Sequence, residues 1–202
     1  MRLVPFCLAL ALAWGCGSSP ESSIRPLGPD SVILAFGDSL TRGTGAPPEK
    51  SYPEVLSEAL GLTVVNAGVP GEVSAEGRAR IPGLLDRHQP DLVILCHGGN
   101  DFLRRLDEGR TRENISAMLD LIRSQGRDVV LIGVPRLGWG LSVPEFYAEL
   151  AREHGCLLVP DLLLDILQRP ELKSDMIHPN SAGYGLMAEK LAETIRRSGA
   201  LP

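Results

Sequence analysis

The sequence is poor in basic residues, in metal-binding residues and in long hydrophobic runs. Its 20 basic side chains are outnumbered by 25 acidic ones, and the formal charge of -5 offers no general attraction to the phosphate backbone of nucleic acids. The four His and four Cys residues show no spacing typical of a metal site. The apolar run 3–13 holds eleven residues, whereas a membrane-spanning helix needs roughly 20. We therefore expect no nucleic-acid partner, no metal ion and no transmembrane anchor.

Two common motifs are also missing. The stretch 43–45 begins like a dinucleotide-binding loop, but Pro48 stands where the third glycine is needed. The nucleophile elbow of α/β-hydrolases, Gly-x-Ser-x-Gly, is absent around Ser39. We expect no cofactor.

The N-terminal segment has the composition of an export signal. Arg2 precedes the apolar run 3–13, and Cys16 follows the small residue Gly15. This order is typical of secretory signals and resembles the lipobox of bacterial lipoproteins. We predict a lipoprotein-type signal peptide over 1–15 and lipidation of Cys16, with ordinary cleavage as the alternative.

The rest of the chain is divided by composition. Residues 16–30 are rich in Gly, Ser and Pro and predict a flexible tether. The remaining residues, 31–202, have the length and mixed composition of one globular domain. We expect this domain to be exported, to the periplasm or the cell envelope, with membrane attachment through Cys16 if that residue is lipidated.

Five short apolar segments alternate with helical patterns along the domain. They are too continuously apolar for a half-exposed antiparallel sheet, and they suit strands that are covered on both faces. Alternating strands and helices with right-handed crossovers give a parallel sheet between two helix layers. The sequence therefore predicts a three-layer α/β/α sandwich. Its strands are expected at 32–36, 63–66, 92–96, 129–133 and 157–159.

Helix start and stop signals lie between these segments. Ser51 with Glu54, and Ser142 with Glu145, have the spacing of a capping box. Gly61 is predicted to end the helix that follows Ser51.

Two cysteines remain once the predicted signal peptide and Cys16 are set aside. Cys96 and Cys156 both fall on expected strands. If another strand separates these two, their Cα atoms lie roughly 9 to 10 Å apart, beyond the limit of roughly 7 Å for a disulfide. We predict two buried free thiols without a catalytic role.

Polar motifs follow the strands, where a parallel sheet gathers its ligand-binding residues. Ser39 follows the first strand, and Asp175 and His178 share one loop near the end of the chain. A serine becomes a nucleophile when a base takes its proton and a third group orients that base. Each motif alone also fits an ordinary turn or helix cap. Together, at strand ends, they predict Ser39, His178 and Asp175 as a catalytic triad.

Acyl transfer also requires donors for the oxyanion of the tetrahedral intermediate. The backbone N–H groups of Ser39 and Gly71 and the side-chain amide of Asn100 are the candidates, because each also follows a strand. We predict that these three groups form an oxyanion hole.

These motifs resemble the blocks of the SGNH (GDSL) hydrolase family, most closely its bacterial periplasmic thioesterase, lysophospholipase and arylesterase branch. The similarity runs from residue 32 to the last expected helix. The blocks are 37–40, 66–71, 98–101 and 175–180, with further matches at Glu72, Ser74, Gly77, Ala79, Arg80 and Pro82. Within the similar stretch 71–74, Val73 stands where the family commonly has Thr.

The resemblance implies a flavodoxin-like sheet of five parallel strands in the order 2-1-3-4-5. It also implies Ser39 as nucleophile, His178 as base and Asp175 as its orienter, with Ser39, Gly71 and Asn100 around the oxyanion. The implied activity is a serine esterase that hydrolyses small carboxylic esters or thioesters through an acyl-Ser39 intermediate.

Two departures from the family pattern bear on the site. His97 stands where relatives usually have an apolar residue. It either contacts and supports the catalytic residues without touching substrate, or is a loop histidine whose hydrogen bonds are satisfied; we favour the second interpretation. The loop 135–143 matches the family only in outline, and such loops line the substrate pocket. Two alternatives therefore remain open: a carbohydrate O-acetyl esterase of the same family, and a non-catalytic surface lipoprotein with this fold.

Overall fold

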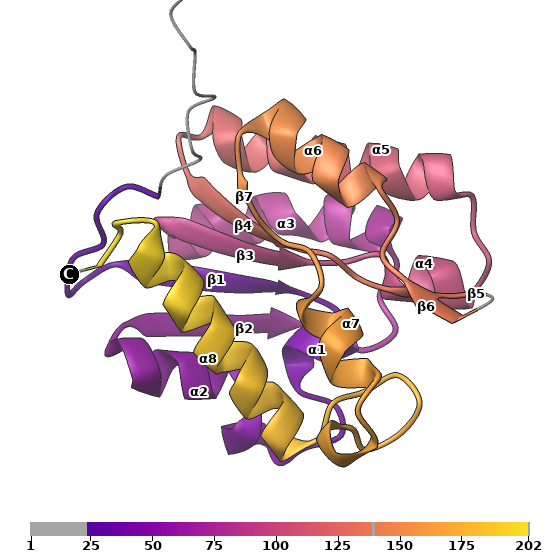
Figure 1. Ribbon diagram of the computed structural model, residues 1–202. Helices are drawn as coiled ribbons and strands as arrows, with labels where there is room; N and C mark the ends of the chain where they lie inside the picture. Colours follow the sequence, from indigo (N-terminus) through magenta and orange to yellow (C-terminus); the bar gives the residue numbers. More distant parts are fainter. Residues whose placement is uncertain (1–23, 139, 202) are drawn as a thin grey trace, which may run out of the picture.

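A five-stranded parallel sheet forms the centre of the domain in the computed structural model, which describes residues 24–138 and 140–201 (Figure 1). The strand order is β2-β1-β3-β4-β7, which confirms the predicted order 2-1-3-4-5. Every predicted strand is present, with ends displaced by one or two residues at most. The strands are β1 (Val32–Gly37), β2 (Thr63–Gly68), β3 (Leu92–Cys96), β4 (Asp128–Ile132) and β7 (Leu157–Val159).

Helices cover both faces of the sheet, so the predicted three-layer sandwich is confirmed (Figure 1). One layer packs α2 (Tyr52–Leu60) against α8 (Ser181–Arg197), with α7 (Leu162–Leu167) beside α8. The other layer holds α3 (Ser74–His88), α5 (Glu108–Ser124) and α6 (Phe146–His154). Because both faces are covered, every residue of β3 and β4 is buried.

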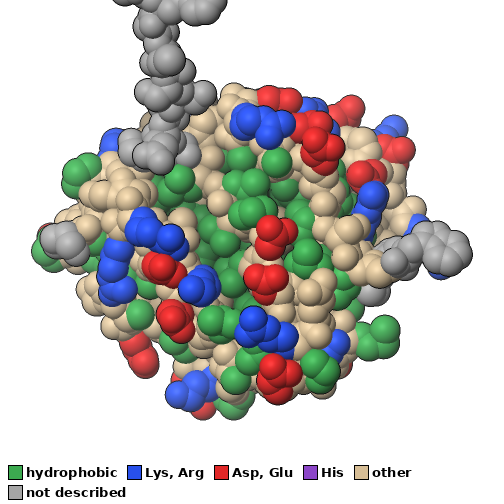
Figure 2. Space-filling model, viewed as in Figure 1, with side chains coloured by type: hydrophobic (Ala, Val, Ile, Leu, Met, Phe, Trp, Pro, Cys, Tyr) green, Lys and Arg blue, Asp and Glu red, His purple; other side chains and the backbone are tan. Residues whose placement is uncertain are grey.

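Smaller elements gather at the carboxyl ends of the strands. In Figure 1 the arrowheads point toward α1 (Ser39–Arg42), α4 (Gly99–Leu103) and the hairpin of β5 (Arg136–Gly138) and β6 (Gly140–Ser142). Two 3-10 turns, Pro48–Lys50 and Pro170–Leu172, complete the connections. On the surface that faces the viewer in Figure 2, acidic and basic side chains are interspersed rather than gathered by sign.

Both predicted capping boxes are wrong. Ser51 is the N-cap residue of α2, but its side chain makes no capping bond, and its buried Oγ lacks a partner among the described residues. Ser142 lies in strand β6, and α6 begins only at Phe146. The loop that contains Ser142 folds back as a hairpin, which removes this serine from the helix start. Gly61 does end α2, in the left-handed conformation with φ of 67°.

Residues 24–30, which the sequence predicts to be tether, pack onto the domain. Ile24 is only 4% exposed and Leu27 only 9%, and both belong to the hydrophobic core. The N–H of Leu27 donates to the carbonyl oxygen of Ala200 at 2.8 Å. The prediction is therefore wrong for this part of the tether, because two buried apolar side chains fix it to the domain.

The remaining N-terminal predictions lie outside the described residues. These are the signal peptide over 1–15, lipidation of Cys16 and the first part of the tether. Within the described part of the chain, no helix combines the length and the apolar character needed to cross a membrane.

The two domain cysteines are free and buried, as predicted. Cys96 ends β3, Cys156 precedes β7, and β4 lies between those strands. Burial raises the pKa of Cys156 to about 11 and that of Cys96 well above its ordinary value. Both thiols therefore stay protonated near neutral pH and are poor nucleophiles.

Candidate active site

The strand ends bring all of the predicted site residues to one edge of the sheet. Ser39 opens α1 directly after β1, Gly71 lies in the loop between β2 and α3, and Asn100 lies in α4 after β3. Asp175 and His178 come from the loop that precedes α8. Segments more than a hundred residues apart in the sequence therefore meet around Ser39.

Ser39, His178 and Asp175 form a hydrogen-bonded row. The Nε2 atom of His178 lies 3.0 Å from Ser39 Oγ, and its Nδ1 atom lies 2.8 Å from Asp175 Oδ2. Because a carboxylate only accepts, Nδ1 carries the proton and Nε2 is left as the acceptor for the Ser39 hydroxyl. This geometry allows His178 to take the hydroxyl proton of Ser39.

The loop that carries Asp175 and His178 is fixed by its own backbone. The Ser174 N–H donates to the carbonyl oxygen of His178 at 2.9 Å, and Asp175 Oδ1 accepts the N–H groups of Ile177 and His178 at 2.8 and 2.9 Å. Partial burial acts to raise the pKa of Asp175, but hydrogen bonds from the His178 ring and these N–H groups outweigh it and lower the pKa below its ordinary value. Asp175 therefore stays ionised opposite His178.

Two of the predicted oxyanion donors are backbone N–H groups. In the described residues, no hydrogen bond uses the N–H of Ser39 or of Gly71. Gly71 has φ of +80°, a conformation that favours glycine over other residues. Its carbonyl oxygen is held by Arg104 Nη2 at 2.7 Å. Unpaired N–H groups at this position suit an oxyanion.

The Asn100 amide donates to two other groups in this structure. Its Nδ2 donates to Asp38 Oδ2 at 3.1 Å and to the carbonyl oxygen of Glu72 at 3.0 Å, so both protons have acceptors. The amide must release one of these to serve an oxyanion. Asp38 also accepts the N–H of Leu40 at 3.0 Å. Burial raises the pKa of Asp38 although His97, the Leu40 N–H and His178 act to lower it.

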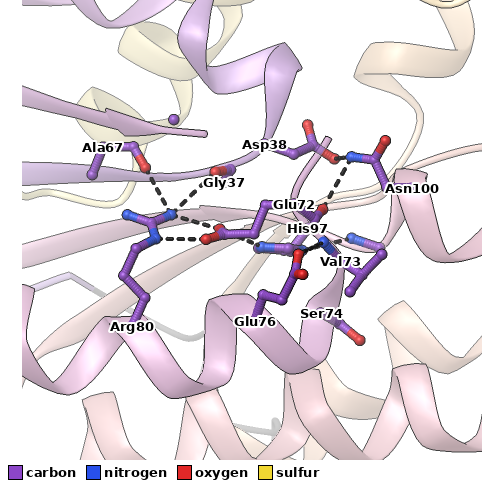
Figure 3. A network of polar contacts seen from close by, with 12 residues as sticks. Gly37, Asp38, Ala67, Glu72, Val73, Ser74, Glu76, Arg80, His97 and Asn100 are labelled. Carbon is purple, nitrogen blue, oxygen red and sulfur yellow. Dashed lines mark hydrogen bonds and ion pairs between the residues drawn. The ribbon is translucent and has the colours of Figure 1, made fainter. Parts of the chain in front are cut away.

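Sequence reasoning missed a buried ion cluster beside the site, made of Glu72, Arg80 and His97 (Figure 3). His97 is completely buried and its Nε2 lies 3.1 Å from Glu72 Oε2. Burial acts to raise the pKa of Glu72, but hydrogen bonds from His97 and Arg80 outweigh it and lower the pKa. Both ring nitrogens of this loop histidine have partners, as the favoured interpretation expects, but one partner, Glu72, lies 25 residues away in the sequence. The one feature of the sequence that pointed to this cluster was His97, at a position where relatives usually have an apolar residue.

A small apolar cavity of about 50 Å³ opens beside Ser39 and His178. Two of its apolar side chains are exposed, Leu103 by 47% and Met176 by 73%, so the lining continues onto the surface. Among the described residues no cluster of His, Cys, Asp or Glu side chains is placed to hold a metal ion. The apolar lining residues are Leu40, Phe102, Leu103, Val134, Pro135, Leu141, Leu167, Met176 and Ile177.

Comparison with known proteins agrees with this geometry. The sequence pattern of the GDSL-like Lipase/Acylhydrolase family matches residues 35–186. The chain is 34% identical over 174 residues to an arylesterase of Vibrio mimicus, covering 81% of this chain and 87% of that protein. It is 30% identical over 174 residues to thioesterase 1/protease 1/lysophospholipase L1 of Escherichia coli strain K12, covering 82% and 83% of the two chains.

The fold agrees as well. The crystal structure of TesA superposes with a TM-score of 0.75 at 28% identity, covering 83% of this chain and 99% of the other. The chain therefore belongs to the GDSL-like lipase/acylhydrolase family, also called the SGNH hydrolases, and is an esterase of that family.

Proposed function

We propose that the protein is an exported serine esterase that hydrolyses small carboxylic esters or thioesters through an acyl-Ser39 intermediate. The observation that carries this proposal is the unbroken row from Ser39 Oγ through the His178 ring to Asp175. His178 Nε2 takes the hydroxyl proton while Oγ attacks the acyl carbon. Collapse of the tetrahedral intermediate expels the alcohol or thiol, which receives that proton.

The second half of the reaction uses the same groups. His178 removes a proton from water, the resulting hydroxide attacks the acyl-Ser39 carbonyl, and the carboxylic acid leaves as Oγ regains its proton. In both halves the N–H groups of Ser39 and Gly71 donate to the oxyanion. The Asn100 amide joins them when it turns one proton away from Asp38 or Glu72.

The cavity favours a short acyl group. A space of 10–15 Å³ holds one water-sized group, so about 50 Å³ accommodates an acyl chain of roughly three to five such groups. Longer chains would have to extend over the exposed side chains of Leu103 and Met176. A cavity of this size also keeps a carbohydrate O-acetyl esterase as the alternative, because acetyl is the smallest acyl group it fits.

Export is supported by the N-terminal sequence alone. The run 3–13 and the Gly15-Cys16 pair are typical of a lipoprotein signal. Mass spectrometry of the mature chain tests this. A diacylglyceryl group on Cys16 supports anchoring to a membrane, whereas an unmodified N-terminus beyond residue 16 supports ordinary cleavage.

Hydrolysis of p-nitrophenyl acetate, butyrate and octanoate by the purified chain tests the activity. We expect kcat/KM to be highest for acetate or butyrate and near-total loss in Ser39→Ala. Ser124→Ala, at the exposed end of α5, is the control and should behave like the unchanged protein. Equal rates in Ser39→Ala and the unchanged protein would reject Ser39 as nucleophile. Hydrolysis of acetylated sugars in preference to all three esters would favour the carbohydrate esterase.

A further inference from the structure

The ion cluster of Glu72, Arg80 and His97 connects the three segments that carry the oxyanion donors (Figure 3). We propose that this cluster positions the oxyanion hole, by fixing the Gly71 N–H and the Asn100 amide relative to Ser39. The inference rests on the proposed role of Ser39. None of the three side chains lines the cavity beside Ser39, so they act as positioning residues.

The Glu72 carboxylate is held at both oxygens. Arg80 donates from Nε to Oε1 at 2.7 Å and from Nη2 to Oε2 at 2.6 Å, a bidentate pair of fixed geometry. His97 Nε2 approaches Oε2 to 3.1 Å. The carboxylate is only 5% exposed, so solvent does not compete for these bonds. The side chain of Glu72 therefore has one orientation.

Each partner of Glu72 is anchored to a different donor segment. Arg80 Nη2 donates to the carbonyl oxygens of Ala67 at 3.0 Å and Gly37 at 3.4 Å, at the ends of β2 and β1. Its guanidinium also stacks on the Phe36 ring at 4.4 Å. Gly37 is two residues from Ser39, so Arg80 ties the nucleophile segment to Glu72.

His97 connects the segment that carries Asn100 to Glu72. It directly precedes Gly98, whose N–H donates to His97 Nδ1 at 3.2 Å. Nδ1 is thus an acceptor, and Nε2 carries the proton that is donated to Glu72. The Tyr147 hydroxyl donates to the His97 carbonyl oxygen at 2.7 Å and fixes the backbone at this point.

Glu72 transmits this restraint to both donors through its backbone. Its carbonyl oxygen accepts Asn100 Nδ2 at 3.0 Å, and the neighbouring residue is Gly71, whose N–H has no partner among the described residues. A rotation of Glu72 would therefore displace the Asn100 amide and the Gly71 N–H together. Displacement by about 1 Å at a reacting centre can lower a rate by about 100-fold.

The charge of Glu72 distinguishes positioning from a direct electrostatic effect. A carboxylate near the site opposes the negative charge that develops on the oxyanion. If Glu72 acted only through its charge, Glu72→Gln would leave the positive Arg80 less neutralised and would speed the reaction. If Glu72 positions the donors, the same substitution weakens its bonds to Arg80 and His97 and slows the reaction.

The test measures Glu72→Gln with p-nitrophenyl acetate. We expect kcat to fall by about 10- to 100-fold with KM within about twofold, because the lost interaction acts in the transition state. The matched control is Asp128→Asn, which removes a buried carboxylate paired with Arg25 and Arg123 at the opposite end of the sheet. We expect it to lower Tm and leave kcat unchanged.

A double-mutant cycle shows whether the effect passes through the oxyanion donors. Glu72→Gln should lower kcat by a smaller factor in an Asn100→Ala background, since one of the two donors that it positions is already gone. His97→Gln, which keeps a donor toward Glu72, should lose less activity than His97→Leu. If Glu72→Gln fails to fold, Glu72→Asp replaces it in the same cycle.

Three results would overturn the inference: an unchanged or faster kcat in the Glu72 variant, equal loss in both backgrounds, or an equal loss in Asp128→Asn. Each is distinct from failure of the proposed function, in which the unchanged protein hydrolyses the ester no faster than Ser39→Ala.

Discussion

Single residues in the site have unequal consequences because they contact the reaction differently. In the proposed mechanism Ser39 forms the bond to the acyl group and His178 moves its proton, so no other residue of the row can replace either. Asp175 acts only through His178, to which it is joined at 2.8 Å. In the proposed oxyanion hole, Asn100 acts together with two backbone N–H groups that no side-chain substitution removes. Removing a group that reacts, Ser39 or His178, should therefore lower kcat more than removing Asp175 or Asn100.

This ranking predicts how far kcat falls in each variant. By analogy with other serine hydrolases, we expect kcat to fall about 10⁶-fold in Ser39→Ala and His178→Ala and about 10⁴-fold in Asp175→Asn. Asn100→Ala should lose about 10²- to 10³-fold. Steady-state kinetics on p-nitrophenyl acetate, with circular dichroism to verify folding, provides the measurement. An Asn100→Ala variant as active as the unchanged protein would exclude this amide from the oxyanion hole.

Helix α3 shows how an element is adapted to the residue that it covers. Gly77 lies in this helix, and a Cβ there would stand 2.4 Å from Nε2 of the buried His97. Gly83 lies in the same helix with nothing within 4 Å of its Cβ position. The first glycine makes room for the ion cluster, whereas the second only weakens the helix.

Replacing the two glycines by alanine should change the free energy of unfolding in opposite directions. Gly83→Ala should stabilise the fold by about 0.5–1 kcal/mol, because alanine is the better helix former. Gly77→Ala should destabilise it and lower kcat, since His97 must move away from Glu72. Urea unfolding and ester hydrolysis of both variants provide the comparison. Stabilisation by Gly77→Ala with unchanged kcat would show that the His97 ring moves at no cost.

On the scale of the whole molecule, local rules predicted the five strands and the edge of the sheet where the site lies, whereas the strand order was implied by the resemblance to the family. Short buried strands are recognisable from continuous apolar runs, and parallel strands bring the residues that follow them to one edge. The positions of Ser39 and Asn100 follow from those two rules. His178 follows α7 rather than a strand, and its place at this edge was implied by the resemblance to the family. The predicted free thiols follow from strand order, which separates Cys96 from Cys156 by β4.

Contacts between distant segments could not be predicted in this way. The pairing of Glu72 with His97 depends on how closely α3 approaches the end of β3, which no local pattern encodes. The hairpin that contains Ser142 overrode a good capping signal, and two isolated apolar residues, Ile24 and Leu27, attached a segment of linker-like composition. In each case tertiary packing outweighed the local sequence preference.

Asp128 links the distant segment around Arg25 to the end of α5 and makes the stability of the whole molecule depend on pH. It accepts from Arg25 near the N-terminus at 2.9 Å and from Arg123 at the end of α5 at 2.7 Å. Burial acts to raise the pKa of this carboxyl, but the hydrogen bonds from Arg25 and Arg123 outweigh it and hold the pKa below the ordinary value of 3.8. The folded state therefore favours the ionised form more than the unfolded chain does.

The lowered pKa fixes the sign of the pH dependence. The stabilisation by Asp128 is complete above the unfolded pKa of 3.8 and disappears as the pH falls through the lower folded pKa. We expect Asp128→Asn to lower Tm by about 5 °C at pH 7, and the difference to shrink below pH 3.8. Asp86→Asn, at an exposed position on α3, should leave Tm unchanged at every pH. A difference for Asp128→Asn that persists unchanged down to pH 3 would mean that Asp128 stabilises the fold by its shape and hydrogen bonds and not by its charge.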